Sequence, residues 1–214
     1  MEKIETRDGS YTFRNPDVDE CYHSTTVGAI EEAEKKYVEP ANLQEGQSVL
    51  DFCFGLGYNT LAALMKVRSL RVVGIEHDRE ILDQIQKNDV PDEYKERYEI
   101  IKDAAKSHYH YDGEVTIKLF LGDAMGALKH IKERFDVILF DPFSPKKNPE
   151  LWTEEIFREV HKVSKKGAIL TTYSCARSVR ENLKNAGWTV HDGPVLGRKS
   201  PATVAVKESA GETE

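Results

Sequence analysis

The sequence predicts an α/β fold in which a mostly parallel, seven-stranded sheet carries helices on both faces. Two observations support this prediction. Short apolar runs alternate with amphipathic stretches of helical period from residue 48 onward, which is typical of βαβ units and a parallel sheet. The last two apolar runs follow one another without a helix, joined by GPVLGRKSP, so we expect them to pair as an antiparallel C-terminal hairpin at one edge of the sheet.

The individual elements follow from local patterns. Residues 10–23 alternate aromatic and polar side chains around Asn15-Pro16, which indicates a small hairpin or an extended arm. VGAIEEAEKKYV has a helical period behind the N-cap candidates Ser24-Thr25-Thr26, and we expect Pro40 to end that helix. Further strands are predicted at 48–54, 70–76, 115–122, 135–141, 167–174, 188–192 and 202–207. Further helices are predicted at 60–69, 78–88, 92–111, 123–131, 154–164 and 176–186.

The length of 214 residues favours one domain with a sizeable core, since the chain has no repeat, low-complexity tract or long linker. We expect residues 1–46 to form an N-terminal arm and helix that cover the active site. Residues 47–207 would form the core, and residues 208–214 a disordered acidic tail.

Composition excludes several classes of protein. Hydrophobic residues make up 39% and charged residues 31%, no apolar run could span a membrane, and the N-terminus lacks a signal peptide. We therefore expect a cytoplasmic protein without a membrane partner, and a monomer. Cys21, Cys53 and Cys175 lie far apart, which excludes a disulfide framework and argues against a structural zinc site, and we expect no bound metal.

Charge is distributed unevenly along the chain. Residues 1–100 carry 12 Lys and Arg against 21 Asp and Glu, whereas residues 101–207 carry 18 against 13. The overall net charge of −7 disfavours a nucleic-acid partner. The excess of Lys and Arg in residues 101–207 is nevertheless compatible with one. Two interpretations stay open at this point: two differently solvated faces, or a basic surface that docks a polyanion.

Acidic residues and glycines follow three successive predicted strands. The turn after the first reads DFCFGLG from Asp51 to Gly57, and Gly55 and Gly57 would let the backbone approach a ligand. Glu76 ends the second strand, where an acid can accept hydrogen bonds from ribose hydroxyls, and Asp123 follows the third. A tight turn and two helix caps are the alternatives, but three acids at one sheet edge together predict an adenosine-type cofactor.

The fourth strand of the core ends in DPFSPKKNP, a loop stiffened by three prolines. Asp141 can orient the N–H groups of a nitrogen nucleophile and help to remove a proton, and Phe143 can stack on a base. A proline-rich connection with an N-terminal Asp turn is the alternative.

These features resemble known families. Seven strands with an antiparallel finish look like the class I S-adenosylmethionine-dependent methyltransferase variant of the Rossmann-like fold, although Cys53 stands at the first glycine of its D/E-x-G-x-G-x-G pattern. DGSYTF, CYHSTTVGAIEEAEKKYV, FDVILFDPFSPKKNPELW and GRKSPATVAV resemble the methyltransferase part of the MnmC family, and its stand-alone members without a flavin domain most of all.

The resemblance, which covers residues 8–206, implies a reaction and site residues. It implies methylation of the amine of 5-aminomethyluridine at the wobble position of tRNA, with S-adenosylmethionine and neither flavin nor metal. Asp141 would align the amine, with Phe143 beside it. Cofactor contacts would come from Asp51, Cys53, Gly55, Gly57, Asn59, Glu76, Asp123 and Asp141.

The same resemblance gives the N-terminal segment and the basic residues a role. Ser10, Tyr11 and Ser24 would fold over the cofactor pocket with Tyr22 and His23, or the tyrosines merely cover the sheet edge and His23 is a packing residue. The residues expected to contact tRNA are Tyr22, His23, Lys146, Lys147, Arg177, Arg180, Arg198 and Lys199.

Two other functions stay open. An aminopropyltransferase of the spermidine synthase type shares the fold and an Asp after the fourth strand, but Lys146 and Lys147 would repel a polyamine. A non-catalytic RNA- or cofactor-binding module would not need the Asp141 loop.

Overall fold

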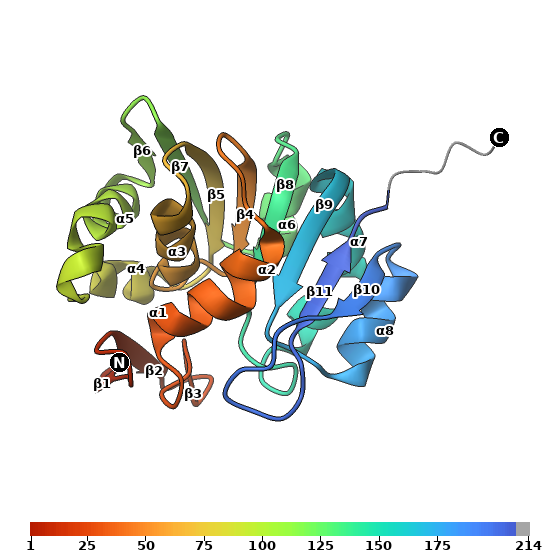
Figure 1. The fold of residues 1–214 in the computed structure, drawn as a ribbon, viewed down its shortest axis with the longest axis horizontal. Coiled ribbons are helices and arrows are strands. Elements are labelled where there is room, and N and C mark those ends of the chain that lie inside the picture. Colours follow the sequence, from red (N-terminus) through yellow and green to blue (C-terminus); the bar gives the residue numbers. More distant parts are fainter. Residues whose placement is uncertain (209–214) are drawn as a thin grey trace.

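An eight-stranded sheet forms the centre of the computed structural model, which describes residues 1–208 (Figure 1). Its strand order is β10-β11-β9-β8-β4-β5-β7-β6, and β9, β8, β4, β5 and β7 are parallel. β11 is antiparallel to β9 and to β10, so the predicted C-terminal hairpin and the mostly parallel α/β fold are confirmed. The strands are β4 (Ser48–Phe52), β5 (Leu70–Glu76), β6 (Tyr109–Tyr111), β7 (Val115–Leu121), β8 (Phe135–Phe140), β9 (Ser164–Thr172), β10 (Thr189–Asp192) and β11 (Thr203–Val206).

The eighth strand, β6, lies where the sequence predicts a helix. The 3-10 turn η2 (Asp92–Tyr94) and helix α5 (Lys95–Ser107) occupy most of the stretch, and His108 ends the helix with a φ of 60°. The following Tyr-His-Tyr then pairs antiparallel with β7. The prediction of helix up to residue 111 is therefore wrong, because aromatic residues beside a free sheet edge favour a strand.

Helices cover both faces of the sheet, and each face has its own hydrophobic core (Figure 1). One core joins the sheet to α3 (Tyr58–Lys66), α4 (Arg79–Ile85), α5 and the N-terminal helix. The other joins it to η3 (Pro149–Trp152), α6 (Ala124–His130), α7 (Glu154–Val163) and α8 (Arg177–Asn185). Burial on both faces explains why the parallel strands read as continuous apolar runs.

The N-terminal arm is a three-stranded antiparallel sheet of β1 (Glu2–Glu5), β2 (Tyr11–Asn15) and β3 (Glu20–Cys21). It extends the predicted hairpin by one strand. The arm lies near the edge where the parallel strands end, as does the loop between β10 and β11 (Figure 1). The Asp8 carboxylate links the arm to the next helix by accepting the backbone N–H groups of Ile30 and Glu31 at 3.0 and 2.9 Å.

That helix changes its winding twice. It begins as α1 (Ala29–Glu32), widens into the π-helical turn η1 (Ala33–Val38) and continues as α2 (Glu39–Ala41). The sequence prediction that Pro40 ends it is wrong by one residue, because the helix includes Pro40 and Ala41. Asn42 ends the helix instead, in the left-handed conformation at a φ of 48°.

The rest of the predicted organisation concerns the chain ends. Apart from Glu208, the predicted acidic tail of 208–214 lies outside the described residues. Within residues 1–208, no helix is both long and apolar enough to cross a membrane.

Candidate active site

Parallel strands bring the predicted acids to one edge of the sheet. β4, β5, β7 and β8 are neighbours, and all four end at this edge. Asp51 is the residue before the last of β4, and Glu76 ends β5. Asp123 lies two residues after the end of β7, and Asp141 directly follows β8. The Asp141 backbone N–H donates to Phe52 O at 3.0 Å, which fixes the start of its loop to β4.

The turn after β4 needs unusual backbone angles. Cys53, Gly55 and Gly57 have φ values of 68°, 54° and 74°. A Cβ at Gly57 would lie 2.5 Å from Ile101 Cγ2, so only glycine fits there. Cys53, which replaces the first glycine of the methyltransferase pattern, adopts the left-handed conformation that glycine usually takes.

A cavity of about 510 Å³ opens above this turn. It lies in the size range of about 300–1,000 Å³ typical of small-molecule sites. Five of the predicted cofactor residues line it: Cys53, Gly55, Glu76, Asp123 and Asp141. The structure does not bring the other three to its wall: Asp51, Gly57 and Asn59.

Glu76 serves both the cavity and the turn. Its Oε1 accepts the backbone N–H groups of His77 and Asp78, and its Oε2 accepts that of Gly55, each at 2.8 Å. A carboxylate offers about four acceptor positions, so one remains on Oε2 for a hydroxyl in the cavity. Burial raises the pKa of Glu76.

Asp51 and Asp123 have local partners as well. Asp51 is fully buried behind the turn, where its Oδ2 accepts the Thr60 hydroxyl at 2.6 Å and burial raises its pKa to about 7. Asp123 caps helix α6 by accepting the Gly126 N–H at 2.7 Å, as one sequence interpretation proposed, and it lines the cavity at the same time.

A second cavity, of about 360 Å³, adjoins the first. The N-terminal segment 20–27 and the loop between β10 and β11 supply much of its wall. Four residues line both cavities: Tyr22, His23, Asp141 and Phe143. Asp141 and Phe143 therefore lie at the boundary between the two cavities.

The Asp141 carboxylate is held from two sides at this boundary. Tyr37 donates its hydroxyl to Oδ1, and Asn59 donates its amide to Oδ2 at 3.0 Å. Asn59, predicted as a cofactor contact, thus orients Asp141. Burial raises the pKa of Asp141 well above its usual value.

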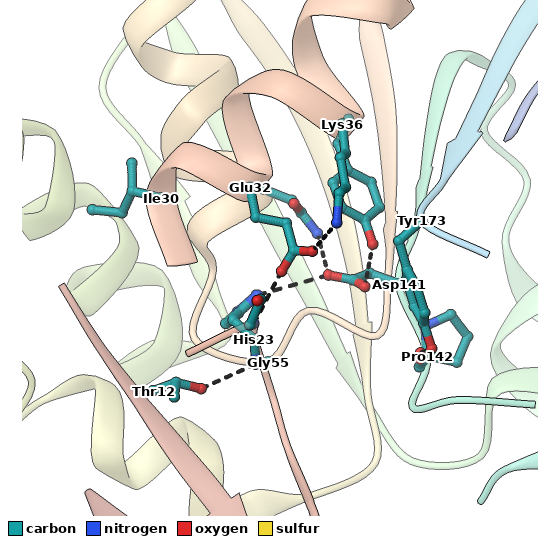
Figure 2. A network of polar contacts seen from close by, with 12 residues as sticks. Thr12, His23, Ile30, Glu32, Lys36, Gly55, Asp141, Pro142 and Tyr173 are labelled. Carbon is teal, nitrogen blue, oxygen red and sulfur yellow. Dashed lines mark hydrogen bonds and ion pairs between the residues drawn. The ribbon is translucent and has the colours of Figure 1, made fainter. Parts of the chain in front are cut away.

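His23 and Tyr22 position the N-terminal segment against this carboxylate. His23 Nδ1 lies 3.9 Å from Asp141 Oδ2, but burial lowers the His23 pKa to about 4, so the ring is neutral at pH 7 and the contact is not an ion pair (Figure 2). Tyr22 donates to Asp78 Oδ2 at 2.7 Å, and its ring centroid lies 4.8 Å from that of Phe143.

Of the predicted basic contacts, Arg198 alone lines a cavity; its guanidinium lies 5.9 Å from the Tyr173 ring centroid. Arg180 is bound within the fold, to Asp192 at 2.6 Å and to the Thr203 hydroxyl at 3.0 Å. The other predicted cations lie outside both cavities: Lys146, Lys147, Arg177 and Lys199.

Sequence reasoning missed the residues that the N-terminal helix contributes. Tyr37 donates to Asp141, and Glu32 and Lys36 line the second cavity. Figure 2 shows the contact between Glu32 and Lys36. Their pattern, EEAEKKY, is that of an ordinary charged surface helix, so no local signal separates these residues from their exposed neighbours.

Comparison with known proteins identifies the class. The profile of a family described as S-adenosyl-L-methionine-dependent methyltransferase matches residues 86–208, more than half of the chain. A profile described as protein-L-isoaspartate(D-aspartate) O-methyltransferase matches residues 22–116. The chain belongs to the S-adenosyl-L-methionine-dependent methyltransferase family, and its cofactor is S-adenosylmethionine.

Individual relatives narrow the similarity to MnmC. The crystal structure of MnmC2 from Aquifex aeolicus has a TM-score of 0.86 and 30% identity over 100% of this chain and 72% of that chain. The bifunctional MnmC protein of Cupriavidus metallidurans is 30% identical over 95% of this chain, and an uncharacterized protein of Methanocaldococcus jannaschii is 33% identical over 95%. The chain spans 33% and 59% of the lengths of these two relatives.

The first cavity fits the cofactor of this family. Glu76 lines the cavity and keeps an acceptor position that could take a ribose hydroxyl, and Asp123, also on the wall, could accept from an adenine amino group. At Gly55 a Cβ would make an ordinary contact with Tyr22 Cδ1 at 3.4 Å, so the φ of 54°, and not a lack of space, favours glycine there. The methyl-donor end of the cofactor would then lie toward Asp141, next to the second cavity.

Proposed function

We propose that this protein methylates the amine of 5-aminomethyluridine at the wobble position of tRNA, giving 5-methylaminomethyluridine. The observation that carries the proposal is the position of Asp141 on the wall common to both cavities. A cofactor in the first cavity and a base in the second would meet at this carboxylate.

S-adenosylmethionine supplies a methyl group on a positively charged sulfur. The amine must present a free electron pair to that carbon, and Asp141 can orient it by accepting one of its N–H groups. As the nitrogen forms the new C–N bond and the C–S bond breaks, positive charge grows on nitrogen, and a proton can leave to Asp141. Its raised pKa makes Asp141 a better proton acceptor than an ordinary carboxylate.

The surroundings of Asp141 suit this role. Tyr37 and Asn59 fix both carboxylate oxygens, so the acceptor is oriented before the amine arrives. Phe143, Tyr22 and Pro142 give the second cavity flat apolar surfaces against which a pyrimidine can stack.

A tRNA substrate is supported by two observations. The relatives in Aquifex aeolicus and Cupriavidus metallidurans are MnmC proteins, and the second is named for tRNA 5-methylaminomethyl-2-thiouridine biosynthesis. Arg198 at the second cavity and the exposed Lys146, Lys147 and Lys199 are available for phosphates around an inserted base.

Aminopropyl transfer is the competing reaction. Lys146 and Lys147 do not line either cavity, so they would not repel a polyamine from the site. Arg198 does line the second cavity, and its charge disfavours a substrate that carries several positive charges, whereas Lys36 on the same wall is neutralised by Glu32.

The test is a reaction with S-adenosylmethionine and tRNA that carries 5-aminomethyluridine. Digestion and mass spectrometry should show 5-methylaminomethyluridine formed at the expense of the precursor. Unmodified tRNA serves as the control and should gain no methyl group. Transfer from decarboxylated S-adenosylmethionine to a diamine, with no reaction on the tRNA, would replace the proposal by aminopropyl transfer.

A further inference from the structure

The second cavity contains a buried ion pair that the methyl transfer itself does not need. Lys36 Nζ donates to Glu32 Oε1 at 2.6 Å, and their side chains are only 6% and 11% exposed. Both residues line the cavity (Figure 2). Lysine and glutamate are rarely buried, and burying such a pair usually brings no stability over apolar side chains. A role in stability therefore does not explain why the pair is there.

A second pair on the same helix shows the usual arrangement. Lys35 and Glu39 have the same spacing of four residues and the same distance of 2.6 Å, but both are about half exposed. The two pairs differ in what they face: Lys35 and Glu39 face solvent, whereas Glu32 and Lys36 face the cavity beside Asp141.

The π-helical turn η1 places Lys36 beside the reacting groups. The turn carries Lys36 and Tyr37 in succession, and Tyr37 donates to Asp141. Such turns are rare and are frequent at functional sites. One turn of helix thus supplies both a support for the carboxylate and an ammonium group on the adjoining wall.

The hydrogen bonds of the pair leave donors free. Glu32 is anchored through Oε2, which accepts the Ser24 N–H at 3.0 Å, and through Oε1, which binds Lys36. An ammonium group has three N–H donors. Within residues 1–208, one hydrogen bond of Lys36 Nζ is observed, so two donors remain for a molecule in the cavity.

The charge of the pair selects the kind of acceptor. Because Glu32 neutralises Lys36, the pair as a whole carries no net charge and suits a neutral carbonyl oxygen better than a phosphate. In a 5-aminomethylpyrimidine, the C4 substituent is on the ring atom next to the one that carries the aminomethyl arm. With the amine at Asp141, the pose of the ring that turns C4 toward the neighbouring wall brings this substituent to the side where Lys36 lies.

We propose that Lys36, held by Glu32, donates a hydrogen bond to the C4 carbonyl oxygen of the base and thereby selects uracil over cytosine. The inference rests on the proposed function. Uracil presents an acceptor at C4, whereas cytosine presents an amino group that donates. A cytosine ring in the same pose would set that amino group against the Lys36 ammonium, leaving donors on both sides unpaired.

The experiment compares two anticodon stem-loop RNAs that differ in the wobble residue, 5-aminomethyluridine or 5-aminomethylcytidine. We expect the wild-type protein to favour the uridine RNA by about 100-fold in kcat/KM. Lys36→Met should lower kcat/KM for the uridine RNA by about 10- to 100-fold, the effect of losing one hydrogen bond from a charged donor. It should change the cytidine RNA little, so the preference collapses.

Controls separate recognition from folding. Lys35→Met removes the matched exposed pair and should keep the full preference for uridine. The double variant Glu32→Gln/Lys36→Met leaves no unpaired charge and should also lose the preference. Binding of S-adenosylmethionine, measured by calorimetry, should be unchanged in all three variants because none of these residues lines the first cavity.

The possible results have distinct meanings. If Lys36→Met slows both RNAs equally and keeps the preference, the pair is structural and the inference is wrong. If the wild-type protein methylates both RNAs equally well, the proposed function stands and the inference again fails. If the wild-type protein methylates neither RNA, the proposed function fails, and the inference falls with it.

Discussion

Replacement of Asp141 by asparagine tests the centre of the mechanism without removing its supports. The amide can accept from Asn59 with its oxygen and donate to the Tyr37 hydroxyl with its nitrogen, so the side chain keeps its place. The variant cannot carry a negative charge or take a proton. Since burial raises the pKa of Asp141, its charge does not stabilise the fold, and Asp141→Asn should melt no lower than the wild type at pH 8.

The size of the effect follows from the charge that is lost. A carboxylate about 4 Å from the positive charge growing on nitrogen contributes roughly 4 kcal/mol at an effective dielectric constant of about 20. This corresponds to about a thousandfold in rate, within the range of about 10²- to 10⁴-fold for positioned acid–base groups. The cost should be seen in the rate of the chemical step, because the charge develops in the transition state.

The assay is single-turnover methylation of tRNA that carries 5-aminomethyluridine, together with calorimetric titration of S-adenosylmethionine. We expect the rate to fall by two to four powers of ten. Cofactor affinity should change by less than about tenfold, since Glu76 and Asp123 remain. Asp136→Asn, at the other end of the same strand, is the matched control and should methylate normally. A normal rate in Asp141→Asn would refute the reasoning and leave this residue a turn former.

Three further predictions concern the supports of Asp141, the cofactor site and the buried Asp51. Tyr37→Phe removes a hydrogen bond that lowers the pKa of Asp141, so the acidic limb of the pH–rate profile should move to higher pH, with a rate about tenfold lower. Glu76→Ala should raise the Kd of S-adenosylmethionine about 10- to 100-fold by calorimetry; an unchanged Kd would remove Glu76 from the site. Burial raises the Asp51 pKa from 3.8 to about 7, so the unfolded state releases this proton first and the residue costs stability as the pH rises through that range. Asp51→Asn should therefore reduce the loss of unfolding free energy between pH 5 and pH 8 in urea titrations by on the order of 2 kcal/mol, and an unaltered pH dependence would contradict this.

Salt dependence tests the RNA partner. If the basic side chains near the second cavity contact phosphates, the affinity for tRNA should fall steeply as the salt concentration rises. Reversing the charge of four of these side chains should then flatten the slope of log Kd against log salt concentration. If the affinity of the wild-type protein for tRNA does not change with salt concentration, these side chains are only solvated surface. The four residues to reverse together are Lys146, Lys147, Arg198 and Lys199.

Much of the fold could be predicted because its signals are local. The alternation of apolar runs with segments of helical period predicted the parallel sheet. The absence of a helical segment between the last two apolar runs predicted the antiparallel hairpin. β6 could not be predicted because its three residues form a strand only through the free edge of β7. The change of winding within the N-terminal helix could not be predicted either, because no residue pattern marks the π-helical turn.

The site residues at the ends of strands could be predicted. The residues from the N-terminal segment and helix that fold over these strand ends could not. Asp141, Glu76 and Asp123 follow from strand topology, since parallel strands end at one edge. Asp51 has the expected sequence position, yet it lies behind the turn, because its partner Thr60 holds it inside the fold. Lys36 could not be told from Lys35, because burial under a distant segment distinguishes them and the charge pattern does not.

The π-helical turn also makes the spacing along the N-terminal helix a determinant of chemistry. Asp8 fixes the beginning of this helix, and Asn42 ends it. Each residue of a regular helix advances the direction of its side chain by about 100°. Losing one residue between Ala33 and Lys36 would therefore turn Lys36 away from the second cavity and Tyr37 away from Asp141. The number of residues in this helix therefore determines whether Lys36 and Tyr37 can hold a base and Asp141 in place beside a bound cofactor.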